Sequence, residues 1–179
     1  PAPYRALAYA DAEVPLGNGE SMLAPKIEAK VLQALAIRPT DRVLEVGTGS
    51  GYLTACLARL GGHVVSIDRD AGLVAEAQAR LTELGIGNVE LIAGDAFDAE
   101  LTRGAYDAIA ITGSLPFLPE RFPALLAEGG RLFAVLGEPP AERATLVTRV
   151  RGEVFLREAL FETVVPPLVG APKPAAFVF

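Results

Sequence analysis

The segment Val43–Tyr52 (VLEVGTGSGY) holds the residues best suited to binding chemistry. A β-branched apolar run leads into three glycines at alternate positions, and a helical pattern follows at once. Glycine at such a point permits a tight turn with positive φ and lets a ligand approach the backbone. The N–H groups and positive dipole end of the next helix favour an anionic group. We expect ligand contacts at Gly47, Thr48, Gly49 and Gly51.

Two acidic residues follow the next apolar runs. Asp68 ends VVSID, 21 residues after Gly47, and a carboxylate at the C-terminal end of a strand there can accept both hydroxyls of a ribose. Asp95 lies in GDAF (94–97), where it can accept from the exocyclic amine of an adenine while Phe97 or Ala96 covers the ring. A helix cap and a turn are the alternative roles of these two acids. Their positions favour a ligand that contains ribose and adenine.

A dinucleotide is the alternative ligand for such a loop. Its fingerprint is G-x-G-x-x-G, but Tyr52 occupies the sixth position and the third glycine comes one step early. No Tyr-x-x-x-Lys pattern or catalytic histidine accompanies it, which disfavours a nicotinamide-dependent oxidoreductase. One histidine (His63) and one cysteine (Cys56) are too few for a zinc cluster or a Cys–His nucleophile pair, so no metal is expected.

Alternating strands and helices must position these residues. Short apolar runs typical of strands buried on both faces lie at 42–46, 63–67, 89–93, 106–112 and 131–137. Helical patterns fill the gaps as YLTACLARL, GLVAEAQARLTEL and the stretch around RFPALLAE, and Gly61, Gly85 and Gly129 are expected to be left-handed C-caps. This alternation predicts an α/β fold with a parallel sheet.

The alternation of strand and helix patterns does not continue on either side of this core. Pro25 opens a helical pattern that ends near Ala36. After residue 137, two strand patterns around Arg151-Gly152 predict an antiparallel hairpin that closes one edge of the sheet. We expect a single domain over 1–179, with an N-terminal segment and helix (1–38), a ligand-binding core (39–137) and a C-terminal hairpin and tail (138–179).

Composition excludes several classes of protein. A chain of 179 residues that is 51% hydrophobic and 21% charged can bury a core and is not disordered. A net charge of −6 argues against nucleic acid as a partner. No apolar run reaches the roughly 18 residues of a membrane span, so no membrane association is expected. The single cysteine cannot form an internal disulfide, which favours the cytoplasm.

The glycine loop, Asp68 and GDAF together resemble the class I S-adenosylmethionine-dependent methyltransferases. A closer resemblance, to the protein-L-isoaspartate O-methyltransferases, covers about residues 15–170 and is carried by Ala24-Pro25 with Ala29, GTGSGYLTACLARL, YDAIAIT and VVPPL. It implies a doubly wound, seven-stranded, mostly parallel sheet, a Rossmann-like methyltransferase fold. It also implies S-adenosylmethionine as cofactor and S-adenosylhomocysteine as product. The methionine end would lie near Glu45–Gly51, the ribose on Asp68 and the adenine near Asp95.

The resemblance further implies the methyl acceptor, the α-carboxylate of isoaspartyl residues in damaged proteins. The expected partner is therefore a peptide or protein with a free carboxylate. The family's substrate loop reads about T-I-S-A-P-x-x-x-A, and its serine hydroxyl helps to hold the acceptor. Here Leu23 stands at the serine position and Ser21 lies two positions earlier, while Ser114 follows the fourth strand. Ser21, Leu23 and Ser114 are the expected acceptor-positioning residues, and the ribose acid, usually Glu in the family, is Asp68.

Two alternatives stay open at this point. Leu23 also suits a methyltransferase of another acceptor, such as a small-molecule acid or a different protein site. It equally suits a non-catalytic relative that keeps the cofactor fold. A carboxylate acceptor needs no general base because it is ionised at neutral pH, and the scarcity of histidine and cysteine agrees with such an acceptor.

Overall fold

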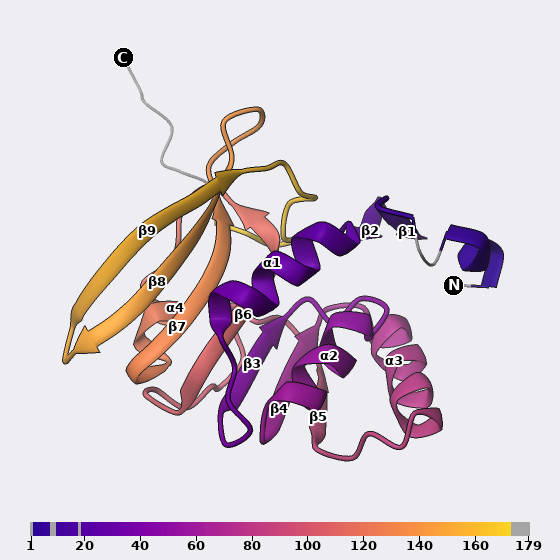
Figure 1. Cartoon of the computed structure of the whole chain (residues 1–179), viewed down its shortest axis with the longest axis horizontal. Helices are drawn as coiled ribbons and strands as arrows, with labels where there is room; N and C mark the ends of the chain where they lie inside the picture. The colour runs from indigo at the N-terminus through magenta and orange to yellow at the C-terminus, as the bar shows by residue number, and fades with distance from the viewer. Residues whose placement is uncertain (1, 8–9, 18, 173–179) are drawn as a thin grey trace.

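The computed structural model describes residues 2–7, 10–17 and 19–172, and residues 173–179 of the expected tail lie outside it. Its main body is a seven-stranded sheet in the order β5-β4-β3-β6-β7-β8-β9 (Figure 1). The strands, from one edge to the other, are β5 (Val89–Ala93), β4 (His63–Asp68), β3 (Arg42–Val46), β6 (Tyr106–Leu115), β7 (Leu126–Leu136), β8 (Arg143–Arg151) and β9 (Val154–Glu162). The first five run parallel, and β8 and β9 pair antiparallel. The predicted α/β sheet and its C-terminal hairpin are confirmed.

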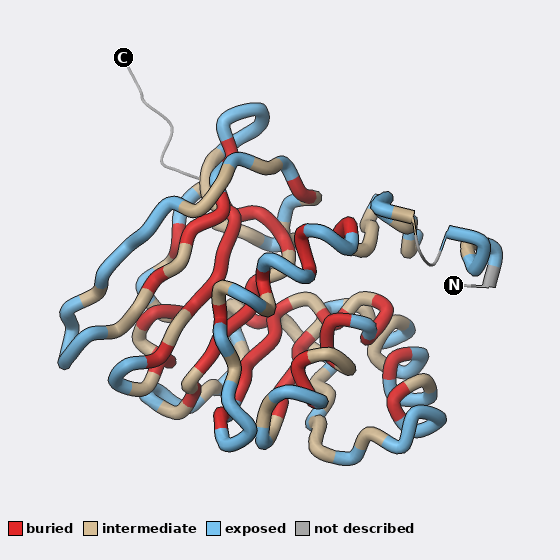
Figure 2. The backbone as a smooth tube through the Cα atoms, in the orientation of Figure 1, coloured by how far each residue is buried: buried red, intermediate tan, exposed pale blue. Residues whose placement is uncertain are grey.

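The central strands are buried on both faces, as Figure 2 shows along the middle of the sheet. Alternate residues of one strand enter two separate hydrophobic clusters, because side chains of a strand point to opposite faces. Val43 packs with residues of α1 (Pro25–Leu35) and α2 (Tyr52–Leu60), while Leu44 packs with Phe122 of α4 (Arg121–Ala124) on the other face. Burial on both faces explains the unbroken apolar runs.

Local chemistry sets the ends of the helices. Pro25 begins α1, where its missing N–H costs no hydrogen bond. Asp70 caps α3 (Ala71–Glu83), and its carboxylate accepts the N–H groups of Gly72 at 2.8 Å and Leu73 at 3.1 Å. In the described part of the chain, no helix combines the length and apolar character needed to cross a membrane.

Two helix ends differ from the prediction. Gly61 has φ −98°, so it is extended rather than left-handed, although its N–H still bonds the Leu57 carbonyl. Gly129 is left-handed, with φ 75°, but lies inside β7. The predicted helix there is only the four residues of α4, because Pro123 brings no N–H and Leu126 already pairs with Tyr106 in the sheet. Gly85, with φ 64°, has the left-handed conformation predicted for it.

The N-terminal segment contains elements that the sequence analysis missed. A 3-10 helix (Ala2–Leu7) precedes a small antiparallel pair, β1 (Val14–Gly17) and β2 (Glu20–Met22). This pair forms its own sheet next to the start of α1 (Figure 1). Strands of three and four residues give too short a pattern to be told from a loop.

The third glycine of the loop serves helix packing. Gly51 is the N-cap of α2 and has φ 80°. A Cβ atom at this position would lie 2.9 Å from the Cβ of Ala77 in α3. Gly51 therefore lets the start of α2 approach α3 closely, and it does not line the cleft described below.

We predict that Gly51→Ala destabilises the protein more than Gly85→Ala. Both alanines adopt a left-handed conformation, which costs about 1–2 kcal/mol. Only the alanine at 51 also collides with a neighbour, since nothing lies within 4 Å of a Cβ at Gly85. Overpacking adds about 1–3 kcal/mol. Urea unfolding of the two variants measures the difference, and equal losses would contradict the packing role.

Candidate functional site

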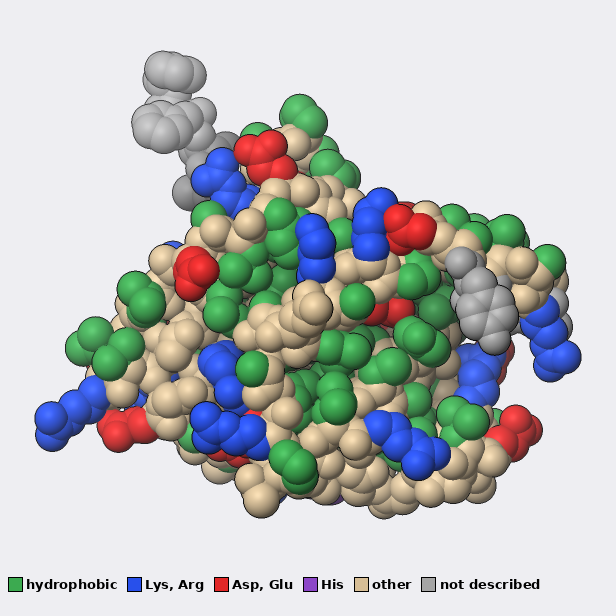
Figure 3. Space-filling view, viewed as in Figure 1, with side chains coloured by type: hydrophobic (Ala, Val, Ile, Leu, Met, Phe, Trp, Pro, Cys, Tyr) green, Lys and Arg blue, Asp and Glu red, His purple; other side chains and the backbone are tan. Residues whose placement is uncertain are grey.

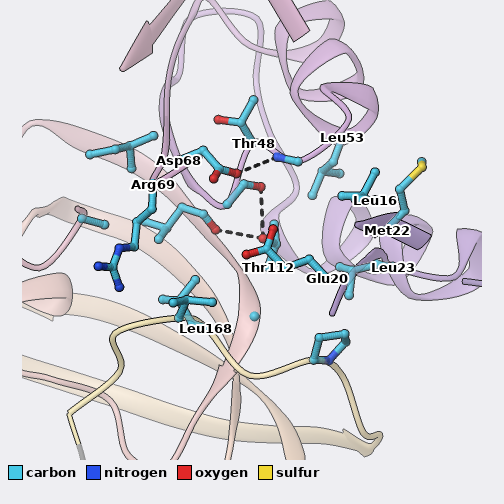
Figure 4. A pocket seen from close by; sticks show the side chains of 18 of the residues that line it. Leu16, Glu20, Met22, Leu23, Thr48, Leu53, Asp68, Arg69, Thr112 and Leu168 are labelled. Carbon is cyan, nitrogen blue, oxygen red and sulfur yellow. Dashed lines mark hydrogen bonds between the residues drawn. The ribbon is translucent and has the colours of Figure 1, made fainter. Parts of the chain in front are cut away.

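A cleft opens where the carboxyl ends of β3, β4 and β6 meet. It encloses about 890 Å³, including the part open to solvent, which suits a cofactor-sized molecule. Its floor is the loop after β3, and its other walls come from the ends of β4 and β5, the N-terminal segment and residues 166–169. Figure 4 shows Asp68 and Arg69 on one side of the cleft and Leu16, Met22 and Leu23 on the other.

The glycine loop is held by a side chain of the neighbouring strand. Thr112 of β6 donates its hydroxyl to the carbonyls of Val46 and Gly47, at 2.9 and 3.1 Å. Gly47 has φ 98°, and a Cβ there would collide with the Thr112 hydroxyl. Gly49 has φ 52° and faces Leu16, whose Cδ1 would lie 3.1 Å from an added Cβ. The two glycines keep the loop backbone open to the cleft.

Asp68 connects the loop to β4. Its Oδ2 accepts the Gly49 N–H at 2.8 Å, and its Oδ1 accepts the Asp70 N–H at 3.0 Å. A carboxylate offers about four lone-pair positions, so two hydroxyls can still be accepted. The side chain therefore both fixes the loop and lines the cleft, as the spacing predicted.

The loop after β5 forms the far end of the cleft. Asp95 accepts the Phe97 N–H at 2.8 Å and lies 3.6 Å from Nε of Arg69. Ala96 is buried and lines the cleft, and Phe97 packs edge-on against Phe122. This end offers a carboxylate and a flat apolar wall, which suit an adenine. Arg69 was not predicted.

Glu45 lies beneath the loop and does not line the cleft. It is fully buried, and its Oε2 accepts the hydroxyls of Thr54 at 2.5 Å and Ser66 at 2.6 Å. Ser66 in turn pairs with Thr48, which does line the cleft, at 2.6 Å. Burial raises the pKa of Glu45 to about 8, so its carboxyl is mostly protonated at neutral pH. Glu45 supports the loop through Ser66 rather than touching a ligand.

The three expected acceptor residues do not converge on one point. Leu23 is 7% exposed and lines the cleft. Ser21 also lines it, but its hydroxyl donates to Glu13 at 2.9 Å. Ser114 is buried outside the lining, and its hydroxyl donates to the Val165 carbonyl at 3.2 Å. Its backbone pairs with Pro166 and Leu168, so Ser114 holds residues 165–168 against β6.

Several lining residues were missed by sequence reasoning. They include Leu16, Glu20, Met22, Glu28 and Arg69. Glu28 alone left a signal, because an acid there interrupts the buried stripe of Ile27, Val31 and Leu35. Burial raises the pKa of Glu20, and the charges of Asp68 and Asp70 raise it further.

The cleft fits S-adenosylmethionine. The backbone of Gly47 and Gly49 is accessible where side chains would fill the space, and Asp68 and Asp95 stand at the places expected for ribose and adenine. The acidic lining also suits a cofactor that carries a sulfonium and an ammonium charge.

We predict that Asp68→Ala weakens S-adenosylhomocysteine binding about 100-fold, since two hydrogen bonds to a charged group contribute about 3 kcal/mol. Calorimetry measures this loss. Asp107→Ala is the matched control, because Asp107 accepts the Arg42 N–H at the opposite end of the sheet. Equal affinity in both variants would exclude Asp68 from the site.

Comparison with known proteins agrees with this geometry. The family model described as protein-L-isoaspartate(D-aspartate) O-methyltransferase matches residues 1–171. A protein-L-isoaspartate O-methyltransferase of Rhodopseudomonas palustris is 39% identical, over 98% of this chain and 83% of the relative. One of Methylorubrum populi is 40% identical, over 87% of this chain and 73% of the relative.

A solved structure is also similar. It is the Plasmodium falciparum protein-L-isoaspartate O-methyltransferase in complex with S-adenosyl-L-homocysteine, which superposes with a TM-score of 0.80 at 27% identity. The match covers 92% of this chain and 83% of that chain.

Proposed function

Since the chain belongs to the protein-L-isoaspartate(D-aspartate) O-methyltransferase family of S-adenosylmethionine-dependent enzymes, we propose that it methylates the free carboxylate of isoaspartyl residues in peptides or proteins. The observation that carries the proposal is the single cleft in which the glycine loop and Asp68 adjoin Leu23 and residues 166–169. The loop would hold the cofactor, and Leu23 and residues 166–169 would line the part of the cleft where an acceptor could meet its methyl group.

The cofactor side of the cleft is the better defined part. Gly47, Thr48 and Gly49 supply backbone, Asp68 takes the ribose hydroxyls, and Asp95 with Ala96 takes the adenine. Glu45 and Gly51 act indirectly, by supporting Thr48 and by placing α2. S-adenosylmethionine, when bound, supplies an activated methyl group on a sulfonium.

The acceptor side of the cleft positions the acceptor carboxylate and excludes water. A carboxylate acceptor is already ionised, so the residues near it need to move no proton. Leu23, Met22 and Leu168 give this part of the cleft an apolar wall, and the rate then comes from orientation in a dry site. Ser114 is a positioning residue that fixes residues 165–168.

The whole chain works as one domain in this proposal. Residues 39–137 supply most of the cofactor contacts, and the described lining residues of the N-terminal segment and of 166–169 supply the acceptor walls. The partner is a peptide or protein rather than nucleic acid, and the compartment is the cytoplasm. On the face seen in Figure 3, Lys and Arg side chains are scattered among acidic and apolar ones rather than gathered in a stripe.

We predict that Leu23→Ser raises kcat/KM toward an isoaspartyl peptide about 10-fold or more. A hydroxyl at this position adds a hydrogen bond to the acceptor carboxylate, which contributes about 1.5–3 kcal/mol. Methyl transfer from labelled cofactor is measured on the isoaspartyl peptide and on its ordinary aspartyl counterpart.

Met22→Ser is the control, since it puts a hydroxyl into the same wall one residue away. No isoaspartyl methylation by either the unmodified protein or Leu23→Ser would reject the proposed acceptor. It would leave a methyltransferase of another acceptor or a non-catalytic cofactor-binding relative.

A further inference from the structure

Glu28 is a buried acid that the proposed reaction leaves unused. It lies on α1, is 6% exposed and lines the cleft. In the described part of the chain its carboxyl group has no hydrogen-bond or ion-pair partner, although burying a charged group without one is costly. Burial raises its pKa to about 7. Such a group is poised to receive a ligand.

Within the described ranges, the titratable groups that face Glu28 carry no positive charge. They are Glu45 from β3 and Tyr52 and Cys56 from α2. Burial raises the pKa of the Cys56 thiol, and the charge of Glu28 raises it further. The lysines of α1 are engaged elsewhere, since Lys26 pairs with Asp11 at 2.8 Å and Lys30 lies over the Phe161 ring.

The position of Glu28 also identifies the part of the cofactor that it meets. Asp68 and Asp95 occupy the ribose and adenine end of the cleft, whereas Glu28 neighbours the start of α2 at the other end of the glycine loop. The amino-acid end of a cofactor bound in this way would lie there. The N-terminus of α2 would attract the carboxylate of that end, and the Glu28 carboxylate would complement its ammonium group.

We propose that Glu28 binds the α-ammonium group of the cofactor as an ion pair. This deepens the proposed function by one contact and rests on its cofactor part alone, not on the acceptor. The pairing requires the carboxylate form, so binding releases the proton that Glu28 holds in the free protein. The affinity for the cofactor therefore has its full value above about pH 7. It falls as the pH drops below 7, because the proton on Glu28 must first be displaced.

The test compares two ligands and two forms of the protein. S-adenosylhomocysteine carries the ammonium group, while 5′-methylthioadenosine lacks the whole amino-acid end. We expect Glu28→Gln to weaken S-adenosylhomocysteine about 10-fold or more at pH 8, since a charged hydrogen bond is lost, and to leave 5′-methylthioadenosine unchanged. In the unmodified protein, affinity for S-adenosylhomocysteine should fall about tenfold per pH unit below 7, while the variant shows no such slope.

Glu20→Gln is the matched control, because Glu20 lines the same cleft beside Asp68 and should affect both ligands alike. An equal loss of both ligands in Glu28→Gln would overturn the proposal, as would unchanged or tighter S-adenosylhomocysteine binding. Calorimetry needs no methyl acceptor. A failure of isoaspartyl methylation therefore leaves this result standing, and a failure here leaves the acceptor assignment untouched.

Discussion

The structure depends on one backbone turn, the passage from β3 into α2 across the ends of two neighbouring strands. Thr112 on β6 binds the carbonyl side of that turn, and Asp68 on β4 binds an N–H from the other side. Only a residue without a side chain can pass Thr112 at Gly47. Because both anchors sit on strands that pair with β3, the sheet register itself fixes the shape of the cleft floor.

The acidic residues around that turn have different roles, and the burial of each side chain decides which role it has. Glu45 is sealed beneath it, so its carboxyl serves as an internal hydrogen-bond acceptor for Ser66 and Thr54. Asp68 stays partly open and keeps its capacity for a ligand. An acidic side chain thus gives either support or recognition, and the sequence pattern does not distinguish the two roles.

The core elements were predictable because their signals are local. Strands buried on both faces leave unbroken apolar runs, and Asp68 and Asp95 follow such runs directly. Ser114 was misplaced, because its partner Val165 lies 51 residues away and nothing nearby indicates that pairing. Glu20 lines the cleft only because the separate sheet of β1 and β2 packs beside it. The short α4 shows the same limit, since sheet pairing at Leu126 overrides a helical pattern.

The β-bridge between Ser114 and Pro167 affects which parts of this protein can vary in evolution. It holds residues 166–168 to the sheet through backbone groups, so an exposed side chain nearby such as Val169 can vary without loss of this pairing. The segment before β3 likewise reaches the cleft without contributing to the seven-stranded sheet. Substitutions in these two segments can reshape the mouth of the cleft while the glycine loop stays intact. Selection can therefore tune which molecules enter without disturbing the residues beneath them.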